Sequence, residues 1–439
     1  MDSMTIGIIG ALALAVLLFS GVHIGVALGL VGFLGSWALV GFEPSLWGAA
    51  NVFYDQVASF ALITVPLFIA MGYLASAGKL SSNIFNALNN WVGKVRGGIG
   101  IATVGSCTLF GTICGSSLVT SSVFAIIAAP EMRRKGYDKS LAYGICASSG
   151  LIGMLIPPSI LMVVYGVLSG DSVGKLLVAG IMPGLVLAVL YSIVILFLAR
   201  YRPRLIKQQT GRSLKWKEKL AELVHLWPVA IVIGITFGGI FGGVFTPTEA
   251  GAIATFVVLS LFLFIDKKKS FGAIKVALQD TARTSAMIFL IFGGAAIFSQ
   301  FLVLSGLAAR TAEFIVGLHL SRLTFLFVVA FFYLILGCLL DSISMLSITI
   351  PLLNPILGSM GIDTIWYAVV VVLAIEVGMI TPPVGLCVYG AKAVAEKDVT
   401  LEDIFRGVFP FFLVSLLGLL LFILVPTLST FLPNLVFDW

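Results

Sequence analysis

Ten long runs of mostly apolar residues are the feature of this sequence that most restricts its fold. A helix needs about 20 apolar residues to cross a hydrocarbon core of roughly 30 Å. Runs of about this length lie at 4–20, 22–41, 60–77, 140–168, 176–198, 227–245, 250–265, 284–304, 364–390 and 408–432. We therefore predict an all-α polytopic membrane protein with about ten spanning segments.

The composition excludes several other classes of protein. Of the 439 residues, 59% are hydrophobic and 10% are charged, whereas about 25% of the residues in an average soluble domain are charged. This balance excludes a soluble enzyme, a nucleic-acid-binding protein and a secreted disulfide scaffold. The five cysteines lie in apolar stretches without metal-binding or redox spacing, so we expect them to be buried free thiols.

The placement of charge predicts the topology. Eight of the 26 Lys and Arg residues lie between Arg200 and Lys219, which predicts a basic cytoplasmic loop at 199–226. Residues 42–59 contain no Lys or Arg, so we expect an external loop there. Continuing this assignment places both termini outside. It also requires the connector 305–322 to face outside, although that connector holds two arginines.

Two further apolar stretches, 99–129 and 323–352, are expected to form re-entrant hairpins. As one helix, residues 99–129 would be about 46 Å long, which exceeds the hydrocarbon core. The middle of this stretch, Gly111–Ser117, is rich in residues that favour turns. Basic residues flank the stretch on both sides, so both ends should be cytoplasmic. The tip should then lie near mid-membrane, between arms of about 14 residues that are too short to cross.

The two halves of the sequence resemble each other at a nearly constant offset. Gly153-Met-Leu-Ile-Pro-Pro158 matches Gly378-Met-Ile-Thr-Pro-Pro383, and the same offset aligns Asp138 with Asp363. By the loop assignment, the first half enters its hairpin from inside and the second from outside. The halves are therefore predicted to be inverted repeats. Inverted repeats with broken helices are typical of secondary transporters.

A Pro-Pro pair interrupts one apolar run in each half, at Pro157-Pro158 and Pro382-Pro383. Two successive prolines remove backbone donors and unwind the helix, which frees several carbonyl groups. Freed carbonyls and the ends of half-helices suit a small cation and an anion near the membrane midplane. The alternative is a structural kink, because proline is common in membrane helices.

Hydroxyl and carboxyl side chains gather at the tips and breaks. The hydroxyls near the first tip and break belong to Thr112, Ser116, Ser117, Thr120, Ser121, Ser122, Ser148, Ser149 and Ser159. Such hard oxygen ligands suit a Na⁺-like cation, although small residues also favour helix packing in membranes. A carboxylate at membrane depth costs about 2.5–3.5 kcal/mol and is a functional candidate by default. Asp341, with Ser342 and Thr381, is therefore a candidate cation site.

Three other features leave alternatives open. Glu376 is either functional or a structural hydrogen-bonding residue. Arg283 and Glu249 lie near the ends of spans and are interpreted as interfacial residues. Residues 79–98 are predicted to form an interfacial amphipathic helix, which either braces a moving domain or anchors the chain at the surface.

Four motifs together carry a resemblance to a known family. They are Cys-Gly115-Ser116-Ser117, Gly-Met-Leu-Ile-Pro-Pro-Ser159, Thr-Pro-Thr-Glu249-Ala-Gly and Glu376-Val-Gly-Met-Ile-Thr-Pro-Pro-Val-Gly385. This ordered set resembles the large membrane (M) subunit of tripartite ATP-independent periplasmic (TRAP) transporters over nearly the whole chain. The resemblance implies an elevator-type importer of organic acids, such as C4-dicarboxylates or sialic acid, in the bacterial inner membrane. No fused small subunit is expected.

The resemblance also implies partners and ligands. The partners would be a small four-helix membrane subunit and a periplasmic substrate-binding protein, and the coupling ion would be Na⁺ at about two sites. The first Na⁺ site would comprise Gly115, Ser116, Ser117 and Pro157, and the second Gly337, Asp341, Thr381 and Val384. Contacts with the organic acid anion are expected at Ser148, Ser149, Ser159, Ser342 and Pro383.

The hairpins and broken helices are expected to form a transport domain from 99–175 and 323–398. The remaining segments are scaffold helices with the interfacial arm helix at 1–98, scaffold helices with the basic loop at 176–283, a scaffold helix and external connector at 284–322, and a C-terminal helix at 399–439.

The main alternative function is a self-sufficient Na⁺/anion symporter or antiporter of a related inverted-repeat fold, which would need no soluble binder. An intramembrane enzyme is not expected, because the sequence lacks HExxH and GxGD motifs. A channel also contains re-entrant loops, but Pro-Pro breaks in both halves fit alternating access better.

Overall fold

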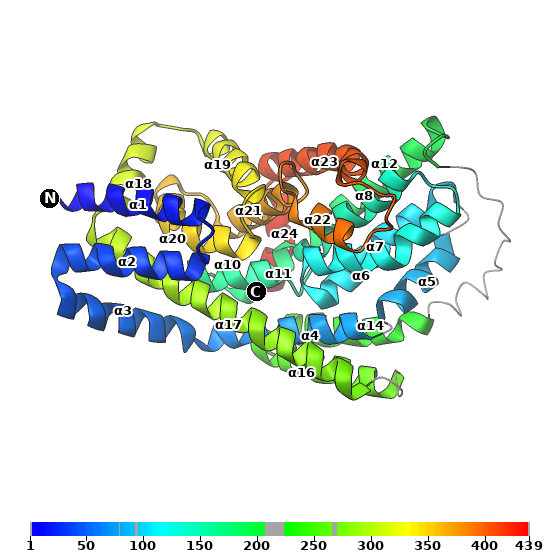
Figure 1. Ribbon diagram of the computed structural model, residues 1–439, viewed down its shortest axis with the longest axis horizontal. Helices are drawn as coiled ribbons and strands as arrows, with labels where there is room; N and C mark the ends of the chain where they lie inside the picture. The colour runs from blue at the N-terminus through cyan, green and yellow to red at the C-terminus, as the bar shows by residue number, and fades with distance from the viewer. Residues whose placement is uncertain (1, 79, 93–94, 207–223, 266–269, 438–439) are drawn as a thin grey trace.

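The computed structural model describes residues 2–78, 80–92, 95–206, 224–265 and 270–437, and these are helical with no β-strand (Figure 1). Six of the described helices are long and apolar enough to cross a membrane, or seven if one bent helix pair counts as a single span. Seven shorter apolar helices accompany them. The helices agree with an all-α polytopic membrane protein, whereas the number of ten spans stays a prediction.

Helices α1 to α4, α16 and α17 pack against one another. They comprise α1 (Ser3–Phe19), α2 (Ile24–Val40), α3 (Phe42–Val57), α4 (Thr64–Ala77, preceded by a 3₁₀ turn at Phe60–Ile63), α16 (Pro247–Ile265) and α17 (Ser270–Leu304). Helix α17 has 35 residues and is therefore about 52 Å long. It packs along α2, where Leu28, Phe298 and Phe301 form a separate apolar cluster. We call α4 and α17 the scaffold wall.

The first hairpin consists of α6 (Gly98–Cys114) and α7 (Ser117–Arg134), joined by a turn at Gly115-Ser116. Gly115 has a φ of 60°, a left-handed conformation that glycine adopts without steric cost. The rings of Phe110 and Phe124 meet across the arms with their centroids 5.6 Å apart. The predicted turn is therefore present, and the arms of 17 and 18 residues are longer than expected. That the hairpin is re-entrant stays a prediction.

The second hairpin consists of α19 (Arg322–Gly337) and α20 (Ser342–Met360), and its turn spans residues 338–341. The hydroxyls of Tyr333 and Thr349 hydrogen bond between its arms. The turn lies where the sequence predicts it, because Gly337 ends one apolar helix and the Asp341 carboxylate caps the next.

Both Pro-Pro pairs break a helix, as predicted. The first broken helix comprises α8 (Lys139–Ser149), α9 (Ile152–Leu155) and α10 (Ile160–Ser169), and bends by 42° at the break. The second comprises α21 (Thr364–Gly378) and α22 (Leu386–Ala393). Every residue from Trp366 to Gly378 is buried, so α21 runs through the main core. We call residues 156–159 the first break and 379–385 the second break.

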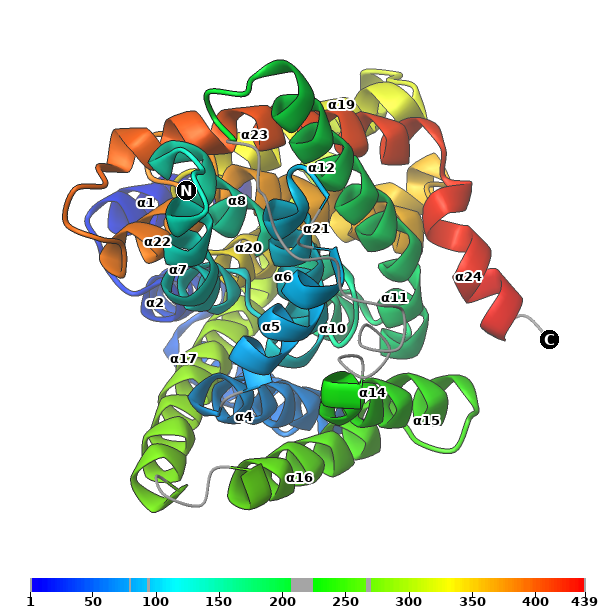
Figure 2. The same cartoon turned by 90° about the vertical axis from the view of Figure 1, so that its right-hand side faces the viewer.

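The other helices surround this centre. They are α5 (Leu80–Val92), α11 (Val173–Ala179), α12 (Ile181–Tyr201), α14 (Trp227–Ile233), a π-helical turn (Gly234–Gly238), α15 (Gly239–Phe241), α18 (Leu307–Gly317), α23 (Leu401–Leu424) and α24 (Thr427–Phe437). Figure 2 shows α4, α16 and α17 on one side of the molecule and α12, α19 and α23 on the other.

Two local predictions are wrong. Residues 42–59 contain helix α3 rather than only a loop, because a segment without Lys or Arg can still form a helix with one polar and one apolar face. The predicted span 408–432 ends at Leu424 and resumes as α24, since Pro426 cannot continue the helix. Residues 270–283, which precede the predicted span 284–304, belong to the same helix α17. Most of the predicted basic loop, residues 207–223, lies outside the described residues.

Candidate functional site

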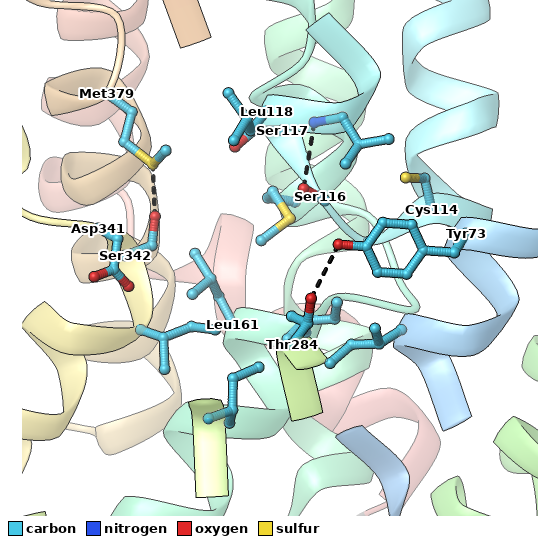
Figure 3. Close-up of a pocket in the computed structure, with 18 of the residues that line it drawn as sticks. Tyr73, Cys114, Ser116, Ser117, Leu118, Leu161, Thr284, Asp341, Ser342 and Met379 are labelled. Carbon is cyan, nitrogen blue, oxygen red and sulfur yellow. Dashed lines mark hydrogen bonds between the residues drawn. The ribbon is translucent and has the colours of Figure 1, made fainter. Parts of the chain in front are cut away.

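A cavity of about 280 Å³ lies where the two hairpin tips face the scaffold wall (Figure 3). This volume is near the lower end of the range for small-molecule sites. The tips contribute Cys114, Gly115, Ser116, Ser117, Leu118, Val119, Asp341, Ser342 and Ile343. Helices α9 and α10, which flank the first break, contribute Met154, Ile160 and Leu161, and the second break contributes Met379. The scaffold wall contributes Ile69, Gly72, Tyr73, Thr284, Met287 and Ile288. The two hairpins, distant in sequence, therefore share one cavity.

The first tip presents a helix N-terminus to this cavity. The Ser116 hydroxyl caps α7 by accepting a hydrogen bond from the Val119 amide at 3.4 Å. A Cβ atom placed on Gly115 would lie 3.4 Å from the carbonyl oxygen of Pro158, so this tip touches the first break. The tip therefore combines hydroxyl oxygens with a carbonyl freed by the Pro-Pro pair.

The second tip presents an equivalent N-terminus with a carboxylate. Asp341 caps α20, accepting hydrogen bonds from the Ser344 amide at 3.1 Å and from the Ser344 hydroxyl. The offset that aligns the two Pro-Pro pairs also aligns Ser116 with Asp341, and it aligns the two amides that they cap. The next residue, Ser342, directs its hydroxyl toward Met379 Sδ at 2.6 Å and Glu376 Oε1 at 3.3 Å.

Behind each tip, a hairpin arm crosses a broken helix at a pair of glycines. A Cβ atom on Gly111 would lie 2.3 Å from the Cα of Gly153, and one on Gly337 would lie 2.9 Å from the Cα of Gly378. These distances show backbones in direct contact, which only residues without a Cβ permit. The offset between the halves aligns Gly153 with Gly378, and nearly the same offset aligns Gly111 with Gly337.

Glu376 is fully buried in α21. Its Oε1 accepts a hydrogen bond of 3.3 Å from the Ser342 hydroxyl at the second tip. Its other oxygen, Oε2, is buried and has no hydrogen-bond partner among the described residues. Glu376 is therefore a buried hydrogen-bonding residue next to the second tip, and a functional role for it stays a prediction.

The structure brings only some of the predicted site residues to the cavity. Gly115, Ser116, Ser117, Asp341 and Ser342 line it. Those that do not line it are Ser148, Ser149, Pro157, Ser159, Gly337, Thr381, Pro383 and Val384.

Several of the residues outside the lining have identifiable local roles. The Ser159 hydroxyl accepts from the Met162 amide at 3.3 Å and donates to the Met154 carbonyl, so backbone groups already engage it. The Thr381 hydroxyl donates to the Val377 carbonyl at 2.6 Å. By contrast, the hydroxyls of Ser148 and Ser149 are buried without a partner among the described residues.

Sequence reasoning missed the scaffold side of the cavity. The hydroxyls of Tyr73 in α4 and Thr284 in α17 hydrogen bond to each other at 3.0 Å and line it (Figure 3). No sequence signal identifies them, because each is a single polar residue in or beside an apolar run. Arg283, the neighbour of Thr284, is exposed. Glu249 is also exposed, and its carboxylate accepts from the Thr246 amide at 2.8 Å at the start of α16.

Comparison with known proteins identifies the family. The isethionate TRAP transporter permease protein DctMQ of Oleidesulfovibrio alaskensis is 32% identical over 95% of this chain, which spans 65% of that longer protein. The C4-dicarboxylate TRAP transporter large permease protein DctM of Pseudomonas aeruginosa is 33% identical over 92% of this chain and 93% of that protein. The sialic acid large permease SiaM of Vibrio cholerae is 29% identical over 95% of this chain and 96% of that protein.

A solved structure shares the fold. The YdaH transporter of Alcanivorax borkumensis superposes with a TM-score of 0.61, with 16% identity over 88% of this chain and 89% of that one. The family described as tripartite ATP-independent periplasmic transporter, DctM component, matches residues 11–428. Its members are transporter permeases and not enzymes. The chain therefore belongs to the DctM family, which comprises the large membrane components of TRAP transporters.

Proposed function

We propose that this chain is the large membrane subunit of a Na⁺-driven secondary transporter that imports an organic acid anion across the bacterial inner membrane. In this proposal a periplasmic substrate-binding protein delivers the anion, and a small four-helix membrane subunit completes the complex. Relatives named for C4-dicarboxylate and sialic acid support a carboxylate substrate. Both termini are placed on the periplasmic side, following the distribution of positive charge in the loops.

The observation that carries the proposal is that two repeat-equivalent helix N-termini face one cavity. Ser116 and Asp341 occupy matching positions in the two halves, cap matching amides and line the same space. The glycine crossings behind the tips match as well. These correspondences support two inverted repeats, the architecture in which secondary transporters place substrate and ion sites near the membrane midplane.

Two Na⁺ sites, which the family resemblance implies, are part of the proposal. The first comprises Gly115, Ser116, Ser117 and Pro157, and the second comprises Gly337, Asp341, Thr381 and Val384. Hydroxyl, carboxylate and carbonyl oxygens are the ligands that hard cations prefer. The carbonyl of Pro158 beside Gly115 supports the first site, and the Asp341 carboxylate supports the second.

The proposed motion is elevator-like. Hairpins and broken helices, at 99–175 and 323–398, would slide as one body against the scaffold. The cavity supports this scheme because its two walls belong to the two bodies, with the tips on one side and α4 and α17 on the other. Contact between the bodies is close at Gly72, where an added Cβ atom would lie 2.4 Å from the Cys114 carbonyl oxygen.

Uptake in proteoliposomes tests the proposal. The chain would be reconstituted with its small partner subunit and the substrate-binding protein encoded beside it, and labelled dicarboxylate and sialic acid would be offered separately. We expect uptake that requires both the binder and an inward Na⁺ gradient. Undiminished uptake without the binder would instead indicate the self-sufficient symporter or antiporter. An uptake rate that is the same with and without the Na⁺ gradient would refute sodium coupling.

A further inference from the structure

A further cavity, of about 410 Å³, lies between the scaffold and the hairpins, away from the one at the tips. We call it the second cavity. Helices α3 and α17 of the scaffold form most of its lining, and Leu168 of α10 and Pro351 of α20 form the opposite wall. Its volume falls within the range of small-molecule sites. Like the cavity at the tips, it therefore lies between the helices proposed to move and those proposed to stay.

The two cavities follow each other along α17. Ile288 lines the cavity at the tips, and Phe292, about one helical turn further on, lines the second cavity. The second cavity continues to Leu304, the last residue of α17. By the distribution of positive charge, residues 42–59 and the connector 305–322 face outside, and Figure 1 shows α3 and α18 at the same end of the molecule. The second cavity therefore lies between the tips and the predicted external face.

Three polar side chains line the second cavity, Gln56 of α3 and Ser299 and Gln300 of α17. None of the three forms a side-chain hydrogen bond with another described residue. The Gln300 amide is also held in place, because a Cβ atom added to Gly48 of α3 would lie 2.7 Å from its Nε2. These donors and acceptors are therefore available to a ligand in the cavity.

The lining suits a carboxylate without holding it tightly. Glutamine amides and serine hydroxyls donate hydrogen bonds to carboxylate and hydroxyl oxygens. The described lining residues include no Asp or Glu, which would repel an anion, and no Lys or Arg, which would bind it through a strong charge-assisted hydrogen bond. Permeation requires sites that bind well enough to admit a solute and weakly enough to release it. This chemistry fits a site through which an organic acid passes.

We propose that the second cavity is an entry site for the imported organic acid, where the amides of Gln56 and Gln300 and the hydroxyl of Ser299 contact the anion before it reaches the hairpin tips. The identity of the ligand rests on the function proposed above, whereas access to the cavity from outside does not. The two cavities then form one route along α17, with uncharged polar groups on the scaffold side of each.

Thiol labelling in intact cells tests access from outside. Ser299→Cys would be exposed to an anionic, membrane-impermeant methanethiosulfonate, and the natural chain gives the background because its five cysteines are buried. Ser285→Cys is the matched control, since Ser285 is buried on the same helix and lines neither cavity. We expect labelling of Ser299→Cys and only background labelling of Ser285→Cys. No labelling of Ser299→Cys from outside would overturn the proposal.

Uptake of labelled succinate, a C4-dicarboxylate, and of labelled sialic acid, each with the binder, tests contact with the anion. Gln56→Ala and Gln300→Ala should each raise the anion concentration for half-maximal uptake about two- to tenfold, the size of one lost hydrogen bond. Gln300→Glu keeps the size of the side chain but adds a negative charge, so it should raise that concentration further. Gln279 is exposed on the same helix and lines neither cavity, so Gln279→Glu is the matched control and should leave uptake unchanged.

The two measurements separate this proposal from the proposed function. Equal uptake by the natural chain and by the Gln56 and Gln300 variants would overturn contact with the anion. Because these two residues lie on different helices, a folding failure of one variant leaves the other to decide. If the natural complex takes up neither acid, the proposed function fails for these substrates, and labelling of Ser299→Cys still decides whether the second cavity opens to the outside.

Discussion

Gly111 and Gly153 lie with their backbones in direct contact, so that a Cβ atom added to Gly111 would come within 2.3 Å of the Cα of Gly153. The same contact recurs in the second half of the chain between Gly337 and Gly378. Each pair joins the first arm of a hairpin, α6 or α19, to the helix that breaks at Pro-Pro. The position of each tip relative to its break therefore depends on two residues without side chains.

Alanine at these crossings should destabilise the protein. Gly111→Ala places a methyl group against backbone that cannot move aside, and overpacking of this kind costs about 1–3 kcal/mol or more. Gly337→Ala should have a smaller effect, because its nearest backbone atom is 2.9 Å away rather than 2.3 Å. Thermal unfolding of the purified variants measures both. Gly358→Ala in α20 is the matched control, since nothing lies within 4 Å of its added Cβ atom. Its melting temperature should equal or exceed that of the natural protein. Equal stability of all three variants would contradict the close crossing.

Removing the charge of Asp341 should weaken Na⁺ dependence while preserving the helix. Asparagine caps a helix about as well as aspartate, so Asp341→Asn keeps the bond to the Ser344 amide and loses only the charge. The Na⁺ concentration for half-maximal uptake should rise about tenfold, which corresponds to roughly 1.4 kcal/mol. Asp341→Ala should add a loss of thermal stability. Ser116→Ala should weaken Na⁺ dependence as well, and unchanged Na⁺-driven uptake in the Asp341 and Ser116 variants alike would remove the site assignment.

Acid should weaken an ionic contact between the two halves. Arg133, at the end of the first hairpin, holds Asp398 through two hydrogen bonds of 2.9 and 2.7 Å, and this lowers the pKa of the Asp398 carboxyl below its usual value. A lowered folded-state pKa gives stability that is present above the unfolded pKa, about 3.9, and disappears as the pH falls through the folded value. The melting-temperature difference between the natural chain and Asp398→Asn should therefore be constant near neutrality and vanish in strong acid. A difference that grows toward low pH would contradict this sign.

The Tyr73 hydroxyl should affect the scaffold wall without affecting the ion sites. Tyr73→Phe removes the 3.0 Å hydrogen bond to Thr284, and such bonds contribute about 0.5–1.5 kcal/mol. We expect a small drop in melting temperature, an altered substrate concentration for half-maximal uptake, and an unchanged Na⁺ curve. Thr284→Val should behave in the same way, and the double variant should add little to either change. A shift of the Na⁺ curve would place the scaffold wall within an ion site.

The sequence determined the features that depend on local chemistry. Apolar runs identified most of the helices, because their length is set by the hydrocarbon that they cross. Glycine and serine located the first turn, and the Pro-Pro pairs located both breaks, because each acts on its own backbone. The similarity between the two halves was also visible in the amino-acid sequence alone. The absence of Lys and Arg did not reveal helix α3, because a segment without positive charge can still be helical.

The contacts between residues far apart in the sequence are a property of the tertiary structure. It placed the tips of two hairpins from opposite halves of the chain around one cavity and gave that cavity a wall from α4 and α17. It also placed Glu376 beside Ser342, and brought the paired glycines behind the tips into contact. These contacts join residues far apart in the chain, so no local pattern encodes them. They arise only when the helices pack and their backbones approach as closely as the glycines allow.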